Sequence, residues 1–215
     1  MTTLLKIGFC LFFLSQTYEY NFNRKLTYEI TDLKNQKKNH LVSYFLNEQD
    51  NSYFSTNNTF DNNREDVTLL DQNGIYWKGQ IKHEDLTKSE ILLKNGTLLP
   101  YQNPYKFQVD NYDFEELKDT VLNNRTCKRF MLRNNVIKNE KKKKLGREIY
   151  VIDTSANIKP LLTFCTAYEV WKSRKNIPNG LIIEKYFYNF KGEMITKEKL
   201  KSSENINIKF KVASE

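Results

Sequence analysis

Apolar and polar residues alternate over much of the chain, and this alternation predicts β-strands. In residues 24–32, Leu26, Tyr28 and Ile30 share one face, while polar residues occupy the positions between them. The same period of two recurs in residues 42–46, 75–82, 130–132, 149–152, 181–190, 194–200 and 206–212. Strands with one solvent-exposed and one buried face are typical of antiparallel sheets. The pattern therefore predicts about nine or ten antiparallel strands.

Local features divide these strands. An Asn95–Gly96 pair between the apolar arms 91–94 and 97–99 predicts a tight hairpin. Helical spacing after Pro160 predicts a helix over residues 160–173, and apolar residues in 111–122 predict a second short helix. The polar segment 57–66 is interpreted as a loop. Strands and helices do not alternate, so the fold class is mainly β, with one or two short helices.

The N-terminus has the order of a secretory signal peptide. Lys6 precedes the apolar run 7–14, and residues 15–17 are polar. A membrane span needs about 20 apolar residues, and this run is much shorter. We therefore predict a signal peptide over residues 1–17 and a single domain over residues 18–215. The alternative is a buried N-terminal strand or helix.

Composition excludes several classes of protein. Hydrophobic residues make up 39% of the 215 residues, which argues against a disordered chain, and the apolar runs are too short for a multi-span membrane protein. The sequence contains only two histidines, His40 and His83, and no GxSxG, HExxH, P-loop or GxGxxG motif. We therefore expect no metal site, no cofactor and no enzymatic activity.

Two cysteines remain if the leader that carries Cys10 is removed. In an oxidising compartment Cys127 and Cys165 can form one disulfide, and two unpaired thiols are the alternative. A nucleophile that combines either cysteine with His83 defines the competing functional hypothesis, a secreted hydrolase with an unrecognised site.

Five segments, in this order along the chain, carry a resemblance to a known family: residues 28–31, 42–46, 124–130, 147–152 and 177–184. Together they resemble the GLPGLI family, secreted proteins of Bacteroidetes named for a motif at the place where this chain has Pro-Asn-Gly-Leu-Ile-Ile, residues 178–183. The Gly-Leu-Pro part of that motif is absent here. In the family's middle-strand motif only Cys127 and Lys128 match. The order of elements is also similar to the LolA/LppX-like lipoprotein-sorting architecture, an antiparallel half-barrel partly closed by helices.

The resemblance implies a secreted, non-catalytic protein of the periplasm or cell envelope. Its concave apolar face would hold a lipid or lipoprotein, or the protein would dock on an outer-membrane receptor. Eight apolar residues are the candidate lining, and their alternative role is ordinary core packing: Trp77, Leu92, Phe130, Ile149, Leu162, Phe164, Trp171 and Ile183.

A basic run lies between two predicted strands and is interpreted as a hairpin tip. Its lysines are Lys138, Lys141, Lys142, Lys143 and Lys144. A solvated loop without a partner is one interpretation. Contact with anionic lipid headgroups, lipopolysaccharide or an acidic partner is another, because clustered lysines are attracted to anionic membranes. Nucleic acid is not expected, since the predicted leader directs the chain out of the cytoplasm.

Overall fold

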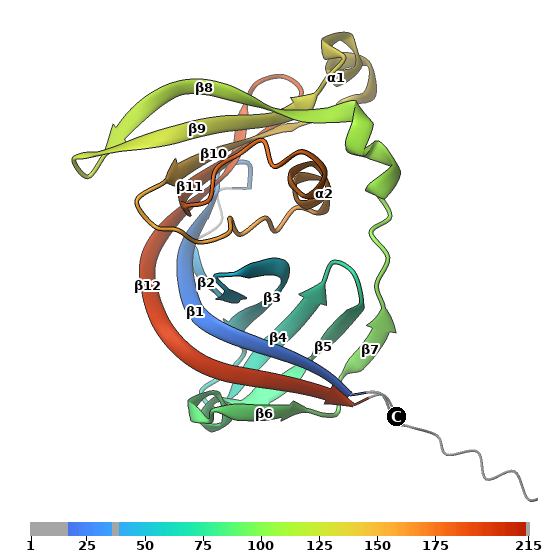
Figure 1. Ribbon diagram of the computed structural model, residues 1–215, viewed down its shortest axis with the longest axis vertical. Coiled ribbons are helices and arrows are strands. Elements are labelled where there is room, and N and C mark those ends of the chain that lie inside the picture. The colour runs from blue at the N-terminus through green and yellow to red at the C-terminus, as the bar shows by residue number, and fades with distance from the viewer. Residues whose placement is uncertain (1–16, 36–38, 214–215) are drawn as a thin grey trace, which may run out of the picture.

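One open, curved β-sheet dominates the computed structural model, which describes residues 17–35 and 39–213 apart from the side chains of residues 137 and 139. The strand order is β7-β5-β4-β3-β2-β1-β12-β11-β10-β9-β8. Every neighbouring pair on this path is antiparallel, whereas β6 adds to β12 in parallel. The prediction of a mainly β, curved antiparallel sheet with few short helices is confirmed (Figure 1).

Twelve strands and four short helical segments make up the described part of the chain. The strands are β1 (Thr17–Asp32), β2 (His40–Asn47), β3 (Asp50–Thr59), β4 (Arg64–Asp71), β5 (Ile75–Lys82), β6 (Glu90–Leu93), β7 (Thr97–Pro100), β8 (Tyr112–Leu122), β9 (Arg125–Asn134), β10 (Arg147–Asp153), β11 (Leu181–Tyr188) and β12 (Met194–Ala213). The α-helices are α1 (Ile137–Lys143) and α2 (Cys165–Arg174), and the 3₁₀ helices are η1 (His83–Thr87) and η2 (Lys106–Asn111).

The long strands β1 and β12 give the sheet its curvature. They pair from Thr17 opposite Ala213 to Asp32 opposite Thr196, and the register shifts twice on the way. Such irregularities increase local bending and twist. The ribbon therefore forms a C-shaped arc, with β2 to β5 folded over its lower part and β8 to β11 along its upper part (Figure 1).

The lower half encloses the first hydrophobic core. Phe45, Leu69 and Trp77 project from β2, β4 and β5 onto residues of β1, β6 and the end of β12. Phe22 and Phe210, for example, meet edge to face with ring centroids 5.0 Å apart. Strand β2 also places Tyr44 and Leu46 in a separate core on its other face. Strand β2 is thus buried on both faces.

The upper half is filled by the chain itself. Helix α2 and the segment before it pack against β8 to β11, where Tyr150, Leu162 and Trp171 are at most 5% exposed. The helix predicted over residues 160–173 is present, but it begins at Cys165. Its N-terminal part is replaced by an extended segment whose Leu161 and Leu162 enter two different cores.

Two local predictions are wrong. Residues 111–122, predicted as a helix, form strand β8, because Tyr112 and Phe114 are buried through antiparallel pairing with β9. Residues 57–66, predicted as a loop, belong largely to β3 and β4, which pair as far as Thr59 opposite Glu65. The predicted signal peptide, residues 1–17, lies outside the described residues except for Thr17, the first residue of β1.

Candidate functional site

A corner of the chain between β6 and β7 leaves the lower half-barrel open. The predicted hairpin over residues 91–99 is wrong: β6 pairs with β12, and β7 pairs with β5. The turn itself is where the Asn–Gly pair placed it, and Asn95 has a left-handed φ of 54°. The arms diverge from this turn because each finds its partner far away in the sequence.

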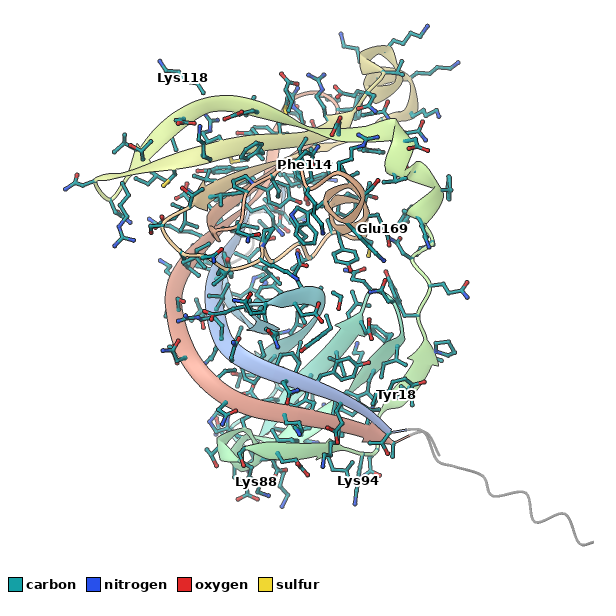
Figure 2. All side chains as sticks on the ribbon, viewed as in Figure 1. Tyr18, Lys88, Lys94, Phe114, Lys118 and Glu169 are labelled. Atoms are coloured by element: carbon teal, nitrogen blue, oxygen red, sulfur yellow. The ribbon has the colours of Figure 1, made fainter. Side chains whose placement is uncertain are left out.

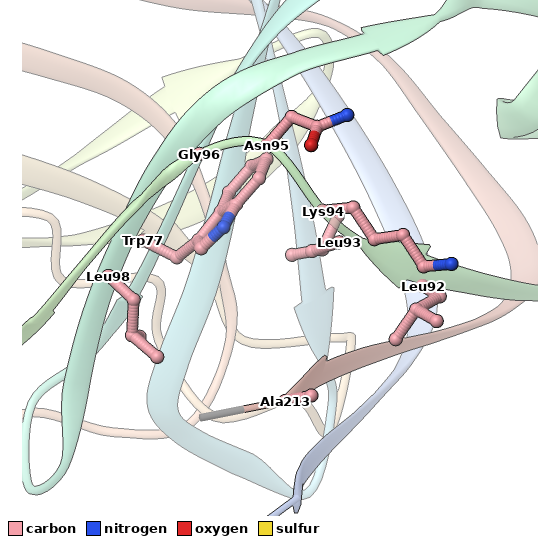
Figure 3. A pocket seen from close by; sticks show the side chains of 8 residues that line it. All are labelled: Trp77, Leu92, Leu93, Lys94, Asn95, Gly96, Leu98 and Ala213. Carbon is pink, nitrogen blue, oxygen red and sulfur yellow. The ribbon is translucent and has the colours of Figure 1, made fainter. Parts of the chain in front are cut away.

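A hollow of about 790 Å³ lies at this corner, and we call it the β6–β7 hollow. Its lining consists of Trp77, Leu92, Leu93, Lys94, Asn95, Gly96, Leu98 and Ala213 (Figure 3). Leu98 lies directly opposite Trp77 across the β5–β7 ladder, and Leu93 opposite Val212 across the β6–β12 ladder. Leucines from two strands therefore face one another around the opening.

Trp77 is held in place by two glycines. A Cβ atom on Gly96 would lie 2.4 Å from Cε2 and Cζ2 of the indole, and one on Gly79 would lie 2.6 Å from Cη2. Both distances are far below van der Waals contact, so the ring needs glycine at each position. Trp77 is 2% exposed and forms a rigid wall of the hollow.

The rim of the hollow combines apolar and cationic groups. Leu92 is 46% exposed, and Lys94 makes no ion pair with the part of the chain that the structure describes. Figure 2 shows Lys94 at the lower end of the molecule, where its side chain reaches solvent. An amphiphile fits this arrangement, because an acyl chain suits the leucines and an anionic head suits Lys94.

At the centre of the concave face, side chains fill the space. Where β11 and β12 cross the middle of the sheet, Lys185 Nζ lies 2.8 Å from Glu198 Oε1 and 3.0 Å from Thr163 Oγ1. The hollow around this pair is only about 10 Å³. The centre of the concave face is therefore a closed polar cluster rather than a channel.

Electrostatics keeps this cluster charged. Burial lowers the pKa of Lys185, but the carboxylates of Glu198 and Glu148 outweigh burial and raise it above its usual 10.5. Burial raises the pKa of Glu148. It also raises the pKa of Tyr44, which faces the same pair, to about 12. The cluster holds a buried ammonium between carboxylates. An acyl chain placed against these charges would be unfavourable in free energy.

The structure does not bring the eight predicted lining residues together. Trp77 and Leu92 line the β6–β7 hollow. Phe130, Leu162 and Trp171 belong to the upper core, to which α2 itself contributes Trp171. Ile149 and Ile183 are partly buried, and Phe164 is 40% exposed. The remaining lining residues of the hollow were missed, although the Asn95–Gly96 turn already marked their location.

The cysteines and His83 lie on separate elements. Cys127 and Cys165 are both unpaired in the structure, so no disulfide joins them. Cys165 Sγ lies 2.8 Å from the Tyr101 hydroxyl, and Cys127 Sγ lies 3.6 Å from the carbonyl oxygen of Arg125. His83 Nδ1 instead contacts Glu65 Oε1 at 2.9 Å. The Cys–His pair of the hydrolase hypothesis is therefore not assembled.

The predicted basic loop contains a helix. Residues 137–143 form α1, which ends at Lys144 in a left-handed conformation with φ 54°. The predicted position is correct, since α1 joins the antiparallel strands β9 and β10. Arg133 Nε holds the helix by donating to Glu140 Oε1 at 2.9 Å. This contact orients the helix on the hairpin, and Lys138 and Lys141 to Lys144 lie at its surface.

Two further features concern the described residues as a whole. No helix among them has the length and apolar character needed to span a membrane. They also contain no group of three or more His, Cys, Asp or Glu side chains placed to hold a metal ion.

These features define the class: a mainly β protein built on one curved antiparallel half-barrel whose upper half is filled by its own helix. No protein-family profile matches the chain. No curated protein sequence matches it.

Among solved structures, the chain is similar to one from the MucA/MucB complex of Pseudomonas aeruginosa, with TM-score 0.44 and 9% identity over 87% of this chain and 53% of that one. It thus spans about half the length of that chain. It is also similar to a putative outer membrane lipoprotein-sorting protein domain from Vibrio parahaemolyticus, with TM-score 0.30, 9% identity and coverage of 87% and 85%. A DUF1329 family protein from Desulfovibrio piger gives TM-score 0.29, 10% identity and coverage of 89% and 86%. All three are resemblances of architecture.

Proposed function

We propose that the protein is a non-catalytic binding protein of the cell envelope, similar to the GLPGLI type, that holds the acyl chain of a lipid or lipoprotein in the β6–β7 hollow. The observation that carries the proposal is a leucine-lined hollow of about 790 Å³ with a buried tryptophan as its wall. Clefts of this size that combine apolar side chains with a few polar groups are typical ligand sites. An apolar segment of an outer-membrane partner is the other occupant that this chemistry admits.

Lys94 supports an anionic amphiphile as the ligand. Its ammonium group lies at the rim of the hollow and has no carboxylate partner in the described residues. A carboxylate or phosphate head can form a charge-assisted hydrogen bond there, while the chain displaces water from the exposed Leu92 and the partly buried Leu98. Each buried methylene contributes about 0.8 kcal/mol.

Fluorescence quenching tests the proposal, because the chain has only two tryptophans and one lines the hollow. In the Trp171→Phe variant, Trp77 is the sole tryptophan whose emission is followed, and bromine is a short-range quencher. We expect dibromostearate to quench this variant in a saturable manner, whereas the Trp77→Phe variant, which emits from Trp171 in the upper core, stays unquenched. Equal quenching of both variants, or of neither, would overturn the proposal.

A rim substitution provides a matched control. Leu92→Glu places a carboxylate at the mouth of the hollow and should abolish saturable quenching in the Trp171→Phe background. Val121→Glu, on β8 and also exposed to solvent at 65%, should leave it intact. Organic extraction of the purified wild-type protein followed by mass spectrometry should also recover copurified lipid. Protein that is empty in every preparation counts against the acyl ligand.

Export is part of the same proposal. The predicted leader supports it, and N-terminal sequencing of the protein from a periplasmic fraction is the direct measurement. Cleavage around Ser15 or Thr17, and so a mature chain that begins near residue 16 or 18, is expected. A cytoplasmic chain that retains its first residues would exclude export.

We further propose that α1 makes peripheral contact with an anionic membrane. Its lysines lie at the upper end of the molecule, and β6 and β7 lie at the lower end (Figure 1). Each lysine near such a surface contributes about 1 kcal/mol. Replacing the five lysines with glutamine should abolish sedimentation with phosphatidylglycerol vesicles at low salt, and unchanged sedimentation would refute the contact. A docked molecule would present the β6–β7 hollow away from the bilayer.

A further inference from the structure

A second hollow, of about 490 Å³, opens at the other end of β6, and we call it the η1 hollow. Helix η1 leads into the first residue of β6, whereas the Asn95–Gly96 corner follows the last one, so the two hollows are separated by the length of that strand. The lining of the η1 hollow comprises Lys25, Thr27, Leu41, Ser43, Phe45, Asn57, Thr59, Glu65, His83, Leu86, Thr87, Glu204, Ile206 and Ile208.

A polar stripe crosses the inner face of the half-barrel at this hollow. The ladder places Thr27 opposite Ser43 and Ser43 opposite Asn57, so the three side chains share one face. Two residues further along β3, and on the same face, Thr59 lies opposite Glu65. Elsewhere on this face the strands carry core residues such as Leu69 and Trp77. The stripe is a local departure from an apolar interior.

Asn57 and Glu65 of this region, together with Ser55 two residues before Asn57 on β3, are almost fully buried. Ser55 is 0% exposed, Asn57 4% and Glu65 6%. Burying a polar group is unfavourable unless it is hydrogen-bonded. Valine or leucine at these positions would pack equally well without this cost. The buried polar groups therefore need hydrogen-bond partners.

One of these groups lacks a partner. Ser55 Oγ donates to Asn57 Oδ1 at 2.9 Å, but Asn57 Nδ2 has no hydrogen-bond acceptor among the described residues. His83 holds Oε1 of Glu65 with a 2.9 Å contact, and the carboxylate has a second oxygen that can accept. The lining of the hollow thus includes Asn57, whose amide donor is unmet, and Glu65, whose carboxylate is held by a histidine through one oxygen.

The charges around the hollow are paired. Glu65 faces His83, and Lys25 Nζ lies 3.9 Å from Glu204 Oε2. The positive and negative charges around the hollow therefore nearly cancel, which disfavours a ligand with net charge. Phe45 and Ile208 supply an apolar wall beside the polar stripe. A suitable ligand carries both hydroxyl groups and C–H surface.

We propose that the η1 hollow is a binding site for a neutral, polyhydroxylated molecule of monosaccharide size. One ligand oxygen accepts from Asn57 Nδ2, and one ligand hydroxyl donates to Glu65. The C–H face of the ring packs on Ile208 and its neighbours. This site is independent of the acyl site, because the two hollows share no lining residue.

Saturation-transfer NMR on the full chain, with D-glucose, D-galactose and N-acetylglucosamine as probes, tests this proposal. We expect at least one sugar to bind with a Kd below about 1 mM. His83→Ala should weaken binding, since Glu65 loses its orienting partner. His40→Ala, at the other histidine and exposed at the start of β2, should not change it. Binding by none of the three sugars overturns the proposal.

Asn57 is tested in two ways, because a buried substitution can also affect folding. Asn57→Ala should raise the Kd about fivefold, the effect of one neutral hydrogen bond. In the wild-type chain, the side-chain amide resonances of Asn57 should shift as sugar is added. This measurement needs no variant. Sugar binding that leaves both the Kd of Asn57→Ala and the wild-type amide resonances unchanged would refute the assignment. So would a stearate titration that displaces the sugar competitively.

Discussion

Replacing Gly96 with alanine tests whether the wall of the β6–β7 hollow is as tightly packed as its geometry indicates. The new methyl group would lie 2.4 Å from two carbon atoms of the Trp77 indole and 2.6 Å from its Nε1. The φ angle of Gly96 lies outside the left-handed region, so the alanine backbone is not itself strained. The perturbation is therefore a single steric contact between two named side chains.

The size of the effect follows from how little room the indole has. On its other side the ring passes within 2.6 Å of the Cβ position of Gly79, and Trp77 is 2% exposed. Overpacking a filled core destabilises by about 1–3 kcal/mol. The loss of glycine's freedom in the unfolded chain offsets about 0.4–1 kcal/mol of this. We expect a net destabilisation of about 1–2 kcal/mol, or roughly 2–8 °C in Tm for a domain of this length.

Urea denaturation followed by circular dichroism measures this change, and a double-mutant cycle shows its cause. Phenylalanine lacks the second ring that the methyl group strikes. In a Trp77→Phe background, Gly96→Ala should therefore cost less than about 0.5 kcal/mol, which gives a coupling in the usual range for contacting residues. If Gly96→Ala destabilises equally in both backgrounds, the indole is not the obstacle. A Gly96→Ala variant as stable as wild type would refute the packing argument outright.

Three further predictions concern the centre of the sheet. Lys185→Met leaves the carboxylate of Glu198 buried without its cation and should destabilise the protein by about 3–5 kcal/mol in a urea titration; a loss below about 1 kcal/mol would contradict this. Burial raises the pKa of Glu148, so the folded state keeps a proton that the unfolded chain releases near pH 4.5. That contribution to stability is complete below pH 4.5 and is lost as pH rises through the folded-state pKa. Stability measured from pH 4.5 to neutrality should therefore fall less in Glu148→Gln than in wild type, and parallel profiles would exclude the effect. Tyr28→Phe removes a buried 2.6 Å hydrogen bond to the carbonyl of Ile182; the expected loss is about 1–3 kcal/mol, and an unchanged urea midpoint would argue against it.

The sheet was predictable because its central strands carry a simple period of two. Leu26 and Tyr28 are 1% and 3% exposed, as their alternation with polar neighbours predicts. Such patterns report burial on one face, which is what an antiparallel strand in a half-barrel needs. The same period was visible in β5, β10 and β11.

The errors arise where polarity does not report exposure. Asn57 and Glu65 are polar and buried, so a segment rich in such residues was interpreted as a loop although it is strand. In β8 only the first residues have a buried face, and Val121 is 65% exposed. With so few constrained apolar positions, the spacing fitted a helix equally well. Pairing with β9, which local sequence does not encode, decided the outcome.

The candidate site was only partly predictable for a related reason. Trp77 and Leu92 were expected to line a ligand site, and they lie at the β6–β7 hollow. Phe130 on β9 and Trp171 on α2 have the same apolar character, but both are packed in the upper core. Hydrophobicity alone cannot tell which core a residue joins. That depends on the divergence of β6 and β7 and on the segment that carries α2.

The division of the concave face also limits the ligand. The β6–β7 hollow belongs to the lower core, and the Lys185–Glu198 pair lies between that half and the core closed by α2. An acyl chain that extended into the upper half would have to displace the core residues Leu162 and Trp171 and lie against a buried ion pair. Both steps oppose entry, because the apolar contacts are already made and the charges lose their compensation. For the proposed acyl ligand, the physical consequence is that only the end of the chain would enter, from outside at the β6–β7 corner, and the hollow would not enclose the whole of it.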